Sequence, residues 1–283
     1  CGWYEKHFCI DKLDERDCYI LIFDGVYMDT TVYVNGKTVG EWKYGYTSFS
    51  FDITDSLVEG DNRILVRVNH KAPNTRWYSG AGIYRNVWLR KTSRNHIIQD
   101  GIYISARPND SDRREQGKWK VTVQTELSVQ TCGTLSFDVI DPIGRETYSC
   151  ERRVCGKSDK LVFYTDCPKL WDTITPNLYS LSVKLCGEDG TQYDYVQTKF
   201  GFRTTRFSPD EGFLLNGIRL KLNGVCMHHD LGALGAAVNY DATYRQLSKM
   251  KEMGVNAIRT SHNPPSRELM DICDEMGLLV DSE

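Results

Sequence analysis

Residues 255–283 read VNAIRTSHNPPSRELMDICDEMGLLVDSE and contain a strand, a helix and the start of a second strand. Val255 to Ile258 is a short apolar strand, and Ser266 can cap the helix that Gly277 closes. Apolar side chains recur along this helix at i, i+3, i+4 and i+7, at Leu269, Ile272, Cys273 and Met276. Leu278 to Val280 begins the second strand. Strand and helix alternating with short loops are typical of parallel βαβ units.

The segment before this stretch has the same alternation. Arg219 to Leu222 predicts a strand, and Asp241 can cap a helix that ends with Lys249 and Lys251 before Gly254. Residues 207–283 are therefore predicted to begin an α/β domain that three strands cannot complete.

Ionisable side chains follow each of the three predicted strands. They are His228-His229-Asp230, Arg259 to Asn263, and Asp281-Ser282-Glu283. In a (β/α)₈ barrel the carboxyl ends of all strands meet at one face, where the catalytic loops lie. Each group also has a structural alternative, such as His228 or Asp230 capping the next segment, or Arg259 pairing with a surface carboxylate. Their presence after all three strands favours one shared site.

The first two-thirds of the sequence predicts β structure. In residues 1–95 an Asn35-Gly36 pair predicts a hairpin, and Phe49 to Ile53 alternates strictly, as in an antiparallel sandwich or jelly roll. Residues 96–206 have strand-like segments at the spacing of an immunoglobulin-like sandwich, with a loop at 109–117. The segments are 118–129, 134–140, 160–164, 178–185 and 193–202.

Composition excludes several classes of protein. The chain has 283 residues, 40% of them hydrophobic and 26% charged, and a net charge of −3 without a basic block. We therefore expect no nucleic-acid partner. No apolar run approaches the roughly 20 residues of a membrane span, so no membrane partner is expected either.

The ten cysteines include no C-x-x-C pair, which argues against a zinc ribbon or a thioredoxin-type motif. Positions such as Cys186 and Cys273 fall where a strand or helix buries a small apolar side chain. This pattern predicts free buried thiols in a reducing compartment and hence a cytoplasmic location, although the sequence start at Cys1 leaves periplasmic or secreted locations open.

Residues 256–264 read NAIRTSHNP and precede DEMG at 274–277 and an apolar run. This pattern resembles the signature of glycoside hydrolase family 2, which contains β-galactosidases, β-glucuronidases and β-mannosidases. Further stretches resemble the family in the same order along the chain: FDGVY 23–27, VNG 34–36, GYT 45–47, FDIT 51–54, RWYSGAGIYR 76–85, LW 170–171, PNLY 176–179, FGFR 200–203, FLLNG 213–217 and GVCMHHD 224–230. The resemblance implies a sugar-binding-like jelly roll over 1–95, an immunoglobulin-like sandwich over 96–206 and the first units of a TIM barrel over 207–283.

The resemblance implies retaining hydrolysis of a terminal β-linked sugar by two glutamates, one the acid/base and the other the nucleophile, about 5–5.5 Å apart. In the family both glutamates lie on later barrel strands. We therefore expect this sequence to hold no catalytic residue, to come from the middle of a longer enzyme and to be inactive alone.

The resemblance further implies that this sequence carries the residues that orient the substrate. We expect His228, His229 and His262 to bind sugar hydroxyls, because a neutral imidazole donates from one nitrogen and accepts at the other. Arg259 is expected to orient a carboxylate. Asp230 is expected to hold a pair of hydroxyls or to fix a histidine tautomer, and Asn263 belongs to the same group.

No cofactor is expected to be required, although Glu283 matches a position at which some β-galactosidases hold Mg²⁺. A strand-end salt bridge is the alternative for this single carboxylate. Some family members send an acidic residue from a sandwich loop toward the site, where this sequence has Asn74-Thr75-Arg76. A sodium or galactose contact from that loop is therefore not expected. Trp77 and Tyr78 could stack on a sugar or belong to a core or an interface.

Two functions from different classes are compatible with these residues. The His-His-Asp-Leu-Gly-Ala run and the Ser-His-Asn-Pro stretch favour a β-galactosidase over enzymes for glucuronate or mannose. The alternative is a non-catalytic carbohydrate-binding or scaffolding module whose barrel has lost catalysis. In both cases the expected partner is a carbohydrate, and a homo-oligomer is a further expectation.

Overall fold

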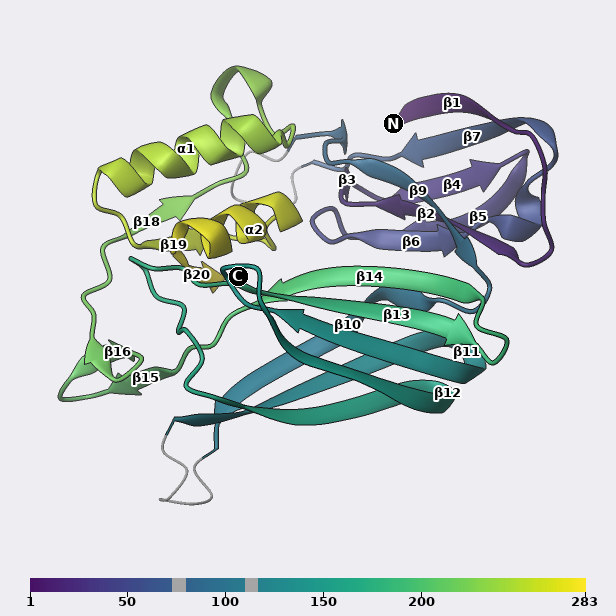
Figure 1. Ribbon diagram of the computed structural model, residues 1–283. Helices are drawn as coiled ribbons and strands as arrows, with labels where there is room; N and C mark the ends of the chain where they lie inside the picture. Colours follow the sequence, from purple (N-terminus) through teal and green to yellow (C-terminus); the bar gives the residue numbers. More distant parts are fainter. Residues whose placement is uncertain (73–79, 110–116) are drawn as a thin grey trace. The chain divides into compact units, whose positions relative to one another are not determined.

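The computed structural model describes residues 1–72, 80–109 and 117–283 (Figure 1). These residues form two compact units. Unit 1 contains Cys1–Thr92, Gly224–Cys273 and Val280–Glu283, and unit 2 contains Ser93–Asn223 and Asp274–Leu279. The expectations for residues 74–76, Trp77 and Tyr78 lie outside the described residues.

Two sheets in the first 93 residues enclose an apolar core. One has the order β1-β7-β4-β5, with strands Gly2–Ile10, Gly60–Val68, Thr30–Val34 and Lys37–Trp42. The other has the order β6-β2-β9, with strands Phe49–Asp52, Asp17–Phe23 and Val87–Ser93. The core combines side chains of both sheets, among them Phe23 and Val66. This arrangement agrees with the antiparallel sandwich that the alternating pattern predicts.

The predicted hairpin at Asn35-Gly36 is confirmed by the pairing of β4 with β5. Asn35 has a φ of 51° and Gly36 a φ of 81°, which are the left-handed conformations of a type I′ turn. Two further short strands, β3 (Val26–Tyr27) and β8 (Gly82–Ile83), pair in antiparallel orientation, and Val26 belongs to the same apolar core.

The remainder of unit 1 is built around a short sheet of order β18-β19-β20, with strands Gly224–Met227, Ala257–Thr260 and Leu279–Ser282 (Figure 1). β18 and β19 are parallel, with Cys226 opposite Arg259. Helix α1 (Tyr240–Glu252) connects β18 to β19, and helix α2 (Arg267–Met276) follows β19. The strand–helix alternation predicted from the sequence is therefore confirmed.

Two details of this region differ from the predictions. The first parallel strand is not Arg219 to Leu222 but β18, whose only sequence signal is a short apolar run after Gly224. The N-cap of α1 is not Asp241 but Asn239, whose side chain accepts a hydrogen bond from the Ala242 amide at 3.0 Å. Asp241 lies in the first turn, where its charge favours the helix dipole.

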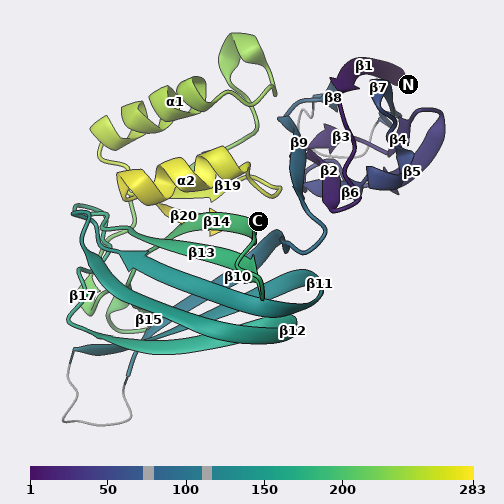
Figure 2. The same cartoon turned by 45° about the vertical axis from the view of Figure 1, so that its right-hand side comes forward.

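The main sheet of unit 2 has five strands and is organised around one long strand. β11 (Lys118–Ile140) pairs with β12 (Glu146–Asp166) along nearly its whole length, as both views show (Figures 1 and 2). The first part of β11 also pairs with β10 (Ile97–Pro108), and the last part pairs with β13 (Tyr179–Gly187), which in turn pairs with β14 (Gln192–Phe200). The predicted strands 118–129 and 134–140 are thus one continuous strand with a register shift between Glu126 and Thr131.

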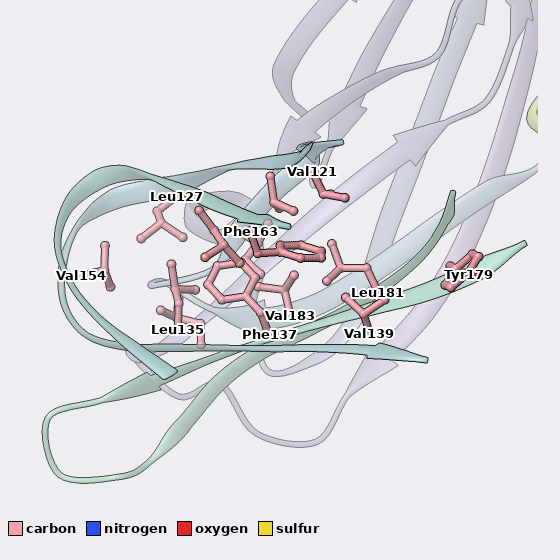
Figure 3. Packing of buried hydrophobic residues seen from close by; sticks show 14 of the residues in the cluster. Val121, Leu127, Leu135, Phe137, Val139, Val154, Phe163, Tyr179, Leu181 and Val183 are labelled. Carbon is pink, nitrogen blue, oxygen red and sulfur yellow. The ribbon is translucent and has the colours of Figure 1, made fainter. Parts of the chain in front are cut away.

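The core of unit 2 collects the alternate apolar side chains of these strands. Figure 3 shows Phe137, Phe163 and Val183 pointing toward one another. Phe137 and Val183 are fully buried. Because successive side chains of a strand point to opposite faces, the strict alternation along β11 fixes which residues enter this core.

A small antiparallel sheet of unit 2 contains β15 (Thr205–Ser208), β16 (Gly212–Leu215) and β17 (Ile218–Arg219). Arg219 is thus the last residue of β17, which pairs with β16 in a hairpin. For this reason the predicted strand at Arg219 to Leu222 is not part of the parallel sheet.

The prediction of free buried thiols is wrong for several cysteines. Cys132 on β11 lies directly opposite Cys155 on β12, and the two form a disulfide. Cys18 and Cys273 are buried and are not disulfide-bonded, in agreement with the prediction, whereas Cys226 is exposed. A helix long and apolar enough to span a membrane is absent from the described residues.

Candidate functional site

The candidate site lies where β18, β19 and β20 end. β18 leads into His228, β19 leads into Ser261 and His262, and β20 is followed by Glu283. Since neighbouring parallel strands present their carboxyl ends at one edge of a sheet, these residues lie together although up to 55 positions separate them in the sequence.

Glu283 is the centre of a charged cluster. Its carboxylate accepts hydrogen bonds from the Arg259 guanidinium and from Nδ1 of His262, the latter at 2.8 Å. Its backbone amide donates to the Thr260 hydroxyl at 3.1 Å, which ties the end of β20 to β19. Arg259 and His262 at the end of one strand and Glu283 at the end of the next therefore form one contact network.

The contacts of this cluster favour the charged forms of its acid and base. The hydrogen bonds from His262 and Arg259 hold the pKa of Glu283 below its ordinary value. Contacts with Cys226 and Glu283 raise the pKa of Arg259. Sγ of Cys226 lies 3.7 Å from Arg259 Nη1, and hydrogen bonds from Ser261 and Arg259 lower the pKa of this thiol. Arg259 thus pairs with the carboxylate of Glu283, and its expected role in orienting a carboxylate at the site stays a prediction.

The two adjacent histidines have different surroundings. The ring of His228 meets that of His262 edge-on, with centroids 5.6 Å apart, so His228 belongs to the cluster. The ring of His229 instead lies 5.0 Å from that of Tyr46, in the sandwich part of unit 1. Burial, assisted by the nearby Arg85 charge, lowers the pKa of His229 to about 4. His229 is therefore neutral near pH 7 and can both donate and accept.

Asn263 and Asp230 lie outside the charged cluster. The hydroxyl of Tyr44, another sandwich residue, donates to Oδ1 of Asn263 at 3.3 Å. Asp230 is exposed, and its charge acts on His229 by raising the pKa of that ring slightly against the effect of burial. The structure thus places Arg259, His228, His262 and Glu283 together, with His229 and Asn263 facing the sandwich.

The surroundings of Glu283 do not fit a magnesium site. Its carboxylate oxygens face a guanidinium and an imidazole, both of which donate to them. Within the described ranges, no three histidine, cysteine, aspartate or glutamate side chains are grouped so that they could hold a metal ion. Mg²⁺ is bound by carboxylates and waters, so the salt bridge, the alternative for Glu283, is the arrangement present here.

Sequence reasoning assigned no role to Cys226, Tyr44 and Tyr46. Tyr46 lies in a stretch quoted for its family resemblance, but an aromatic residue in a predicted sandwich is usually a core residue. Only the fold brings Tyr44 and Tyr46, more than 180 positions upstream in the sequence, against Asn263 and His229.

Comparison with family models covers nearly the whole chain. The sugar binding domain of glycosyl hydrolases family 2 matches residues 1–93, a further model named glycosyl hydrolases family 2 matches residues 97–203, and the TIM barrel domain of the same family matches residues 209–283. The three models occur in the order expected from the resemblance.

Curated relatives and solved structures agree with these models. The chain is 44% identical over 291 residues to beta-galactosidase BoGH2A of Bacteroides ovatus, covering 100% of this chain and 34% of the relative. It is 32% identical to a beta-glucuronidase of Bacteroides fragilis, covering 100% of this chain and 43% of the relative. The chain thus spans about a third to two-fifths of the length of these relatives.

Among solved structures, a glycosyl hydrolase family 2 member from Bacteroides cellulosilyticus superposes with a TM-score of 0.91 at 36% identity, covering 99% of this chain and 39% of that one. A Bacteroides uniformis beta-glucuronidase 2, covalently bound to cyclophellitol-6-carboxylate aziridine, has a TM-score of 0.86 at 29% identity, covering 99% of this chain and 36% of that one. The collinear matches, the parallel strand ends and these superpositions lead to one assignment: the chain belongs to glycosyl hydrolase family 2.

Proposed function

We propose that the whole protein is a retaining, exo-acting glycosidase that hydrolyses terminal β-linked galactosides. The observation that carries this proposal is the cluster of Arg259, His262 and Glu283 at the ends of adjacent strands in a chain of this family. Such strand ends are where barrel enzymes place their active sites.

In this proposal the present residues orient the sugar while two glutamates beyond Glu283 perform the chemistry. Imidazoles of His228, His229 and His262 bind ring hydroxyls. Hydrogen bonds that tighten as the ring flattens toward an oxocarbenium ion lower the barrier selectively. Glu283 holds the His262 ring and the Arg259 guanidinium in fixed directions, so that these donors are preorganised before the substrate binds.

The contacts of Arg259 and Arg85 support a neutral sugar over a uronic acid as the substrate. Recognition of a glucuronate carboxylate requires a cation that is available to pair with it. Arg259 is already paired with Glu283, and Arg85 donates to backbone carbonyls. The 44% identity to a protein named beta-galactosidase supports the same substrate, while relatives named beta-glucuronidase make glucuronides the competing class.

Retention of configuration is supported by the similar structure that is covalently bound to cyclophellitol-6-carboxylate aziridine. A covalent intermediate requires two carboxyl groups only about 5–5.5 Å apart. The 283-residue chain is proposed to be inactive alone because it is expected to lack both of them.

The test compares the whole protein and the 283-residue chain on chromogenic β-galactoside, β-glucuronide and β-mannoside. We expect the whole protein to cleave the β-galactoside with the highest kcat/KM and the chain alone to cleave none. Preference for the glucuronide would refute the substrate, and turnover by the chain alone would refute the placement of the catalytic glutamates.

The alternative, a non-catalytic carbohydrate-binding or scaffolding module, makes a different prediction for the sequence after Glu283. An Asn-Glu pair at the end of a later strand supports the enzyme, and its absence supports the binding module. The finer architecture, a jelly roll followed by an immunoglobulin-like sandwich, remains a proposal that rests on the resemblance. The cytoplasmic location, which rests on the cysteine content alone, and a homo-oligomer also remain proposals.

A further inference from the structure

We infer that Arg85, a buried residue of the sandwich, is a positioning residue for the loop that carries His262 and Asn263. This inference rests on the proposed function for its catalytic consequence. It rests on the contacts of Arg85, Tyr44 and Tyr46 for its structural part.

Arg85 is 6% exposed, and its guanidinium donates to backbone carbonyls of three separate segments. Nη1 donates to the carbonyl oxygens of Tyr46 at 2.9 Å and Asp24 at 3.3 Å. Nη2 donates to the carbonyl oxygen of Pro264 at 3.0 Å. A guanidinium presents its donors in a rigid planar fork, so it fixes the directions of these carbonyls relative to one another.

The surroundings of Arg85 are shaped to hold it in this place. Its guanidinium carbon lies 5.1 Å from the centroid of the Tyr84 ring. A Cβ atom at Gly25 would come within 2.7 Å of Cδ of Arg85, so the absence of a side chain at Gly25 makes room for the arginine stem. Removing a cation from water costs free energy, and this desolvation lowers the pKa of the buried Arg85 guanidinium.

Pro264 follows the candidate site residues directly, since His262 and Asn263 are the two residues before it. The same sandwich segment that accepts from Arg85 also contacts the site. The Tyr44 hydroxyl donates to Asn263, and the Tyr46 ring lies against His229. The Tyr84 hydroxyl donates to the Gly45 carbonyl at 2.8 Å, which holds this segment from its other side.

Arg85 thus connects the two sides of the candidate site. One arm of the fork holds the loop after β19, and the other holds the segment that packs on His229 and Asn263. When a substitution removes the guanidinium, both the loop after β19 and the segment containing Tyr46 are free to shift. A displacement of about 1 Å in a substrate-orienting group can reduce the rate about 100-fold.

The test uses the whole protein with the variants Arg85→Met, Arg85→Lys and Arg16→Met. Methionine keeps an unbranched apolar stem without donors, and lysine keeps the charge without the planar fork. Arg16→Met is the matched control, because Arg16 is an exposed sandwich residue paired with Asp14 at 2.7 Å. The first measurement is amide hydrogen exchange of the peptide that covers residues 261–266. The second is kcat and KM on a β-galactoside.

We expect exchange of residues 261–266 to rise at least tenfold in both Arg85 variants and to stay unchanged in Arg16→Met. We expect kcat to fall at least tenfold, with KM changing less than threefold, because the loss is greatest for interactions that tighten in the transition state. A merely structural role would instead raise exchange throughout the sandwich, including β4 and β7.

A further variant keeps the test decisive if Arg85→Met and Arg85→Lys do not fold. Tyr44→Phe removes only the hydroxyl bonded to Asn263 from a side chain that is 45% exposed. It should raise exchange of residues 261–266 two- to threefold. Unchanged exchange of these residues in every folded variant, or raised exchange without a loss of kcat, would overturn the inference. If the unmodified protein cleaves no β-glycoside, the proposed function fails while the exchange data still decide the structural part of the inference.

Discussion

Glu283 is the residue on which the charged cluster depends, because both Arg259 and His262 donate to its carboxylate. In the whole protein, Glu283→Gln should lower kcat/KM on a β-galactoside 10- to 100-fold, since a neutral amide gives Arg259 a weaker acceptor and can turn its NH₂ toward His262. Steady-state kinetics measure the change.

The matched control for this variant is Glu252→Gln, which also removes a glutamate from an ion pair. Glu252 pairs with Lys249 on the exposed surface of α1, at 2.7 Å. Its replacement should leave kcat/KM unchanged. Equal kinetics for Glu283→Gln and the unmodified protein would show that the cluster plays no part in substrate orientation.

His229 makes stability depend on pH in a defined direction. Its pKa in the folded protein is about 4, below the ordinary value of 6.5, because of burial and the charges of Arg85 and His228, with opposing effects from Asp230 and the Asn263 backbone. The unfolded chain therefore binds more protons between these two values, so folding is progressively destabilised as the pH falls from about 6.5 toward 4. Because His229 is only half-buried, the total effect stays below about 3 kcal/mol.

Thermal unfolding of the whole protein at pH 7 and pH 5 measures this effect. The decrease in melting temperature between the two pH values should be smaller for His229→Gln than for the unmodified protein. His70→Gln, at an exposed histidine of the same sandwich, should retain the full decrease. A decrease that is the same in all three proteins would contradict the neutral state of His229.

At the scale of the helices, the N-cap of α1 distinguishes the structure from the sequence pattern. Asn239→Ala removes the side chain bonded to the Ala242 amide and should lower the local stability of α1 by about 1 kcal/mol. Asp241→Ala removes only a favourable charge in the first turn and should cost about 0.5 kcal/mol. Hydrogen exchange along α1 measures both, and a larger cost for Asp241→Ala would restore Asp241 as the cap.

At the scale of the strands, burial along β11 predicts where a shortened side chain destabilises unit 2 most. Phe137 is fully buried, and Phe137→Ala should destabilise unit 2 by about 3 to 5 kcal/mol. Val129→Ala, on the same strand but 40% exposed, should cost less than about 1 kcal/mol. Exchange of the β11 and β12 amides measures the difference, and similar costs at the two positions would contradict the placement of Phe137 in the core.

The local spacing of apolar residues was sufficient to predict helices and strands that bury one of their faces in a core. The spacing of Leu269, Ile272, Cys273 and Met276 predicts α2, and Gly277 closes it, as the left-handed φ of 71° requires. The first parallel strand could not be placed in the same way. β18 forms because it pairs with β19, more than 30 residues away in the sequence. The strand-like pattern at Arg219 to Leu222 is local, and only Arg219 of these residues lies in a strand, the hairpin strand β17.

The candidate site was predictable only as a set of strand ends. The order of strands in a barrel brings His228, Arg259, His262 and Glu283 to one edge, so a prediction from topology finds them. Which carboxylate Arg259 contacts, and which sandwich residues reach the loop, depend on side-chain directions that no local pattern encodes. This is why Tyr44, Tyr46 and Arg85 received no role from the sequence.

For the molecule as a whole, the chain supplies two β-rich regions and the first strands of a TIM barrel domain, and its relatives are about two to three times as long. The proposed division of labour follows from this coverage. Orienting groups lie on the early strands, and the reacting carboxylates are expected on the later ones. A sugar bound between them would contact both parts.

The most direct measurement is a crystal structure of the whole protein with a covalently trapped 2-deoxy-2-fluorogalactosyl group. The account predicts that the sugar is bonded to a glutamate beyond Glu283 and that a ring nitrogen of His228 or His262 lies about 3 Å from a sugar hydroxyl. A trapped sugar that contacts neither histidine and lies away from the ends of β18, β19 and β20 would contradict it.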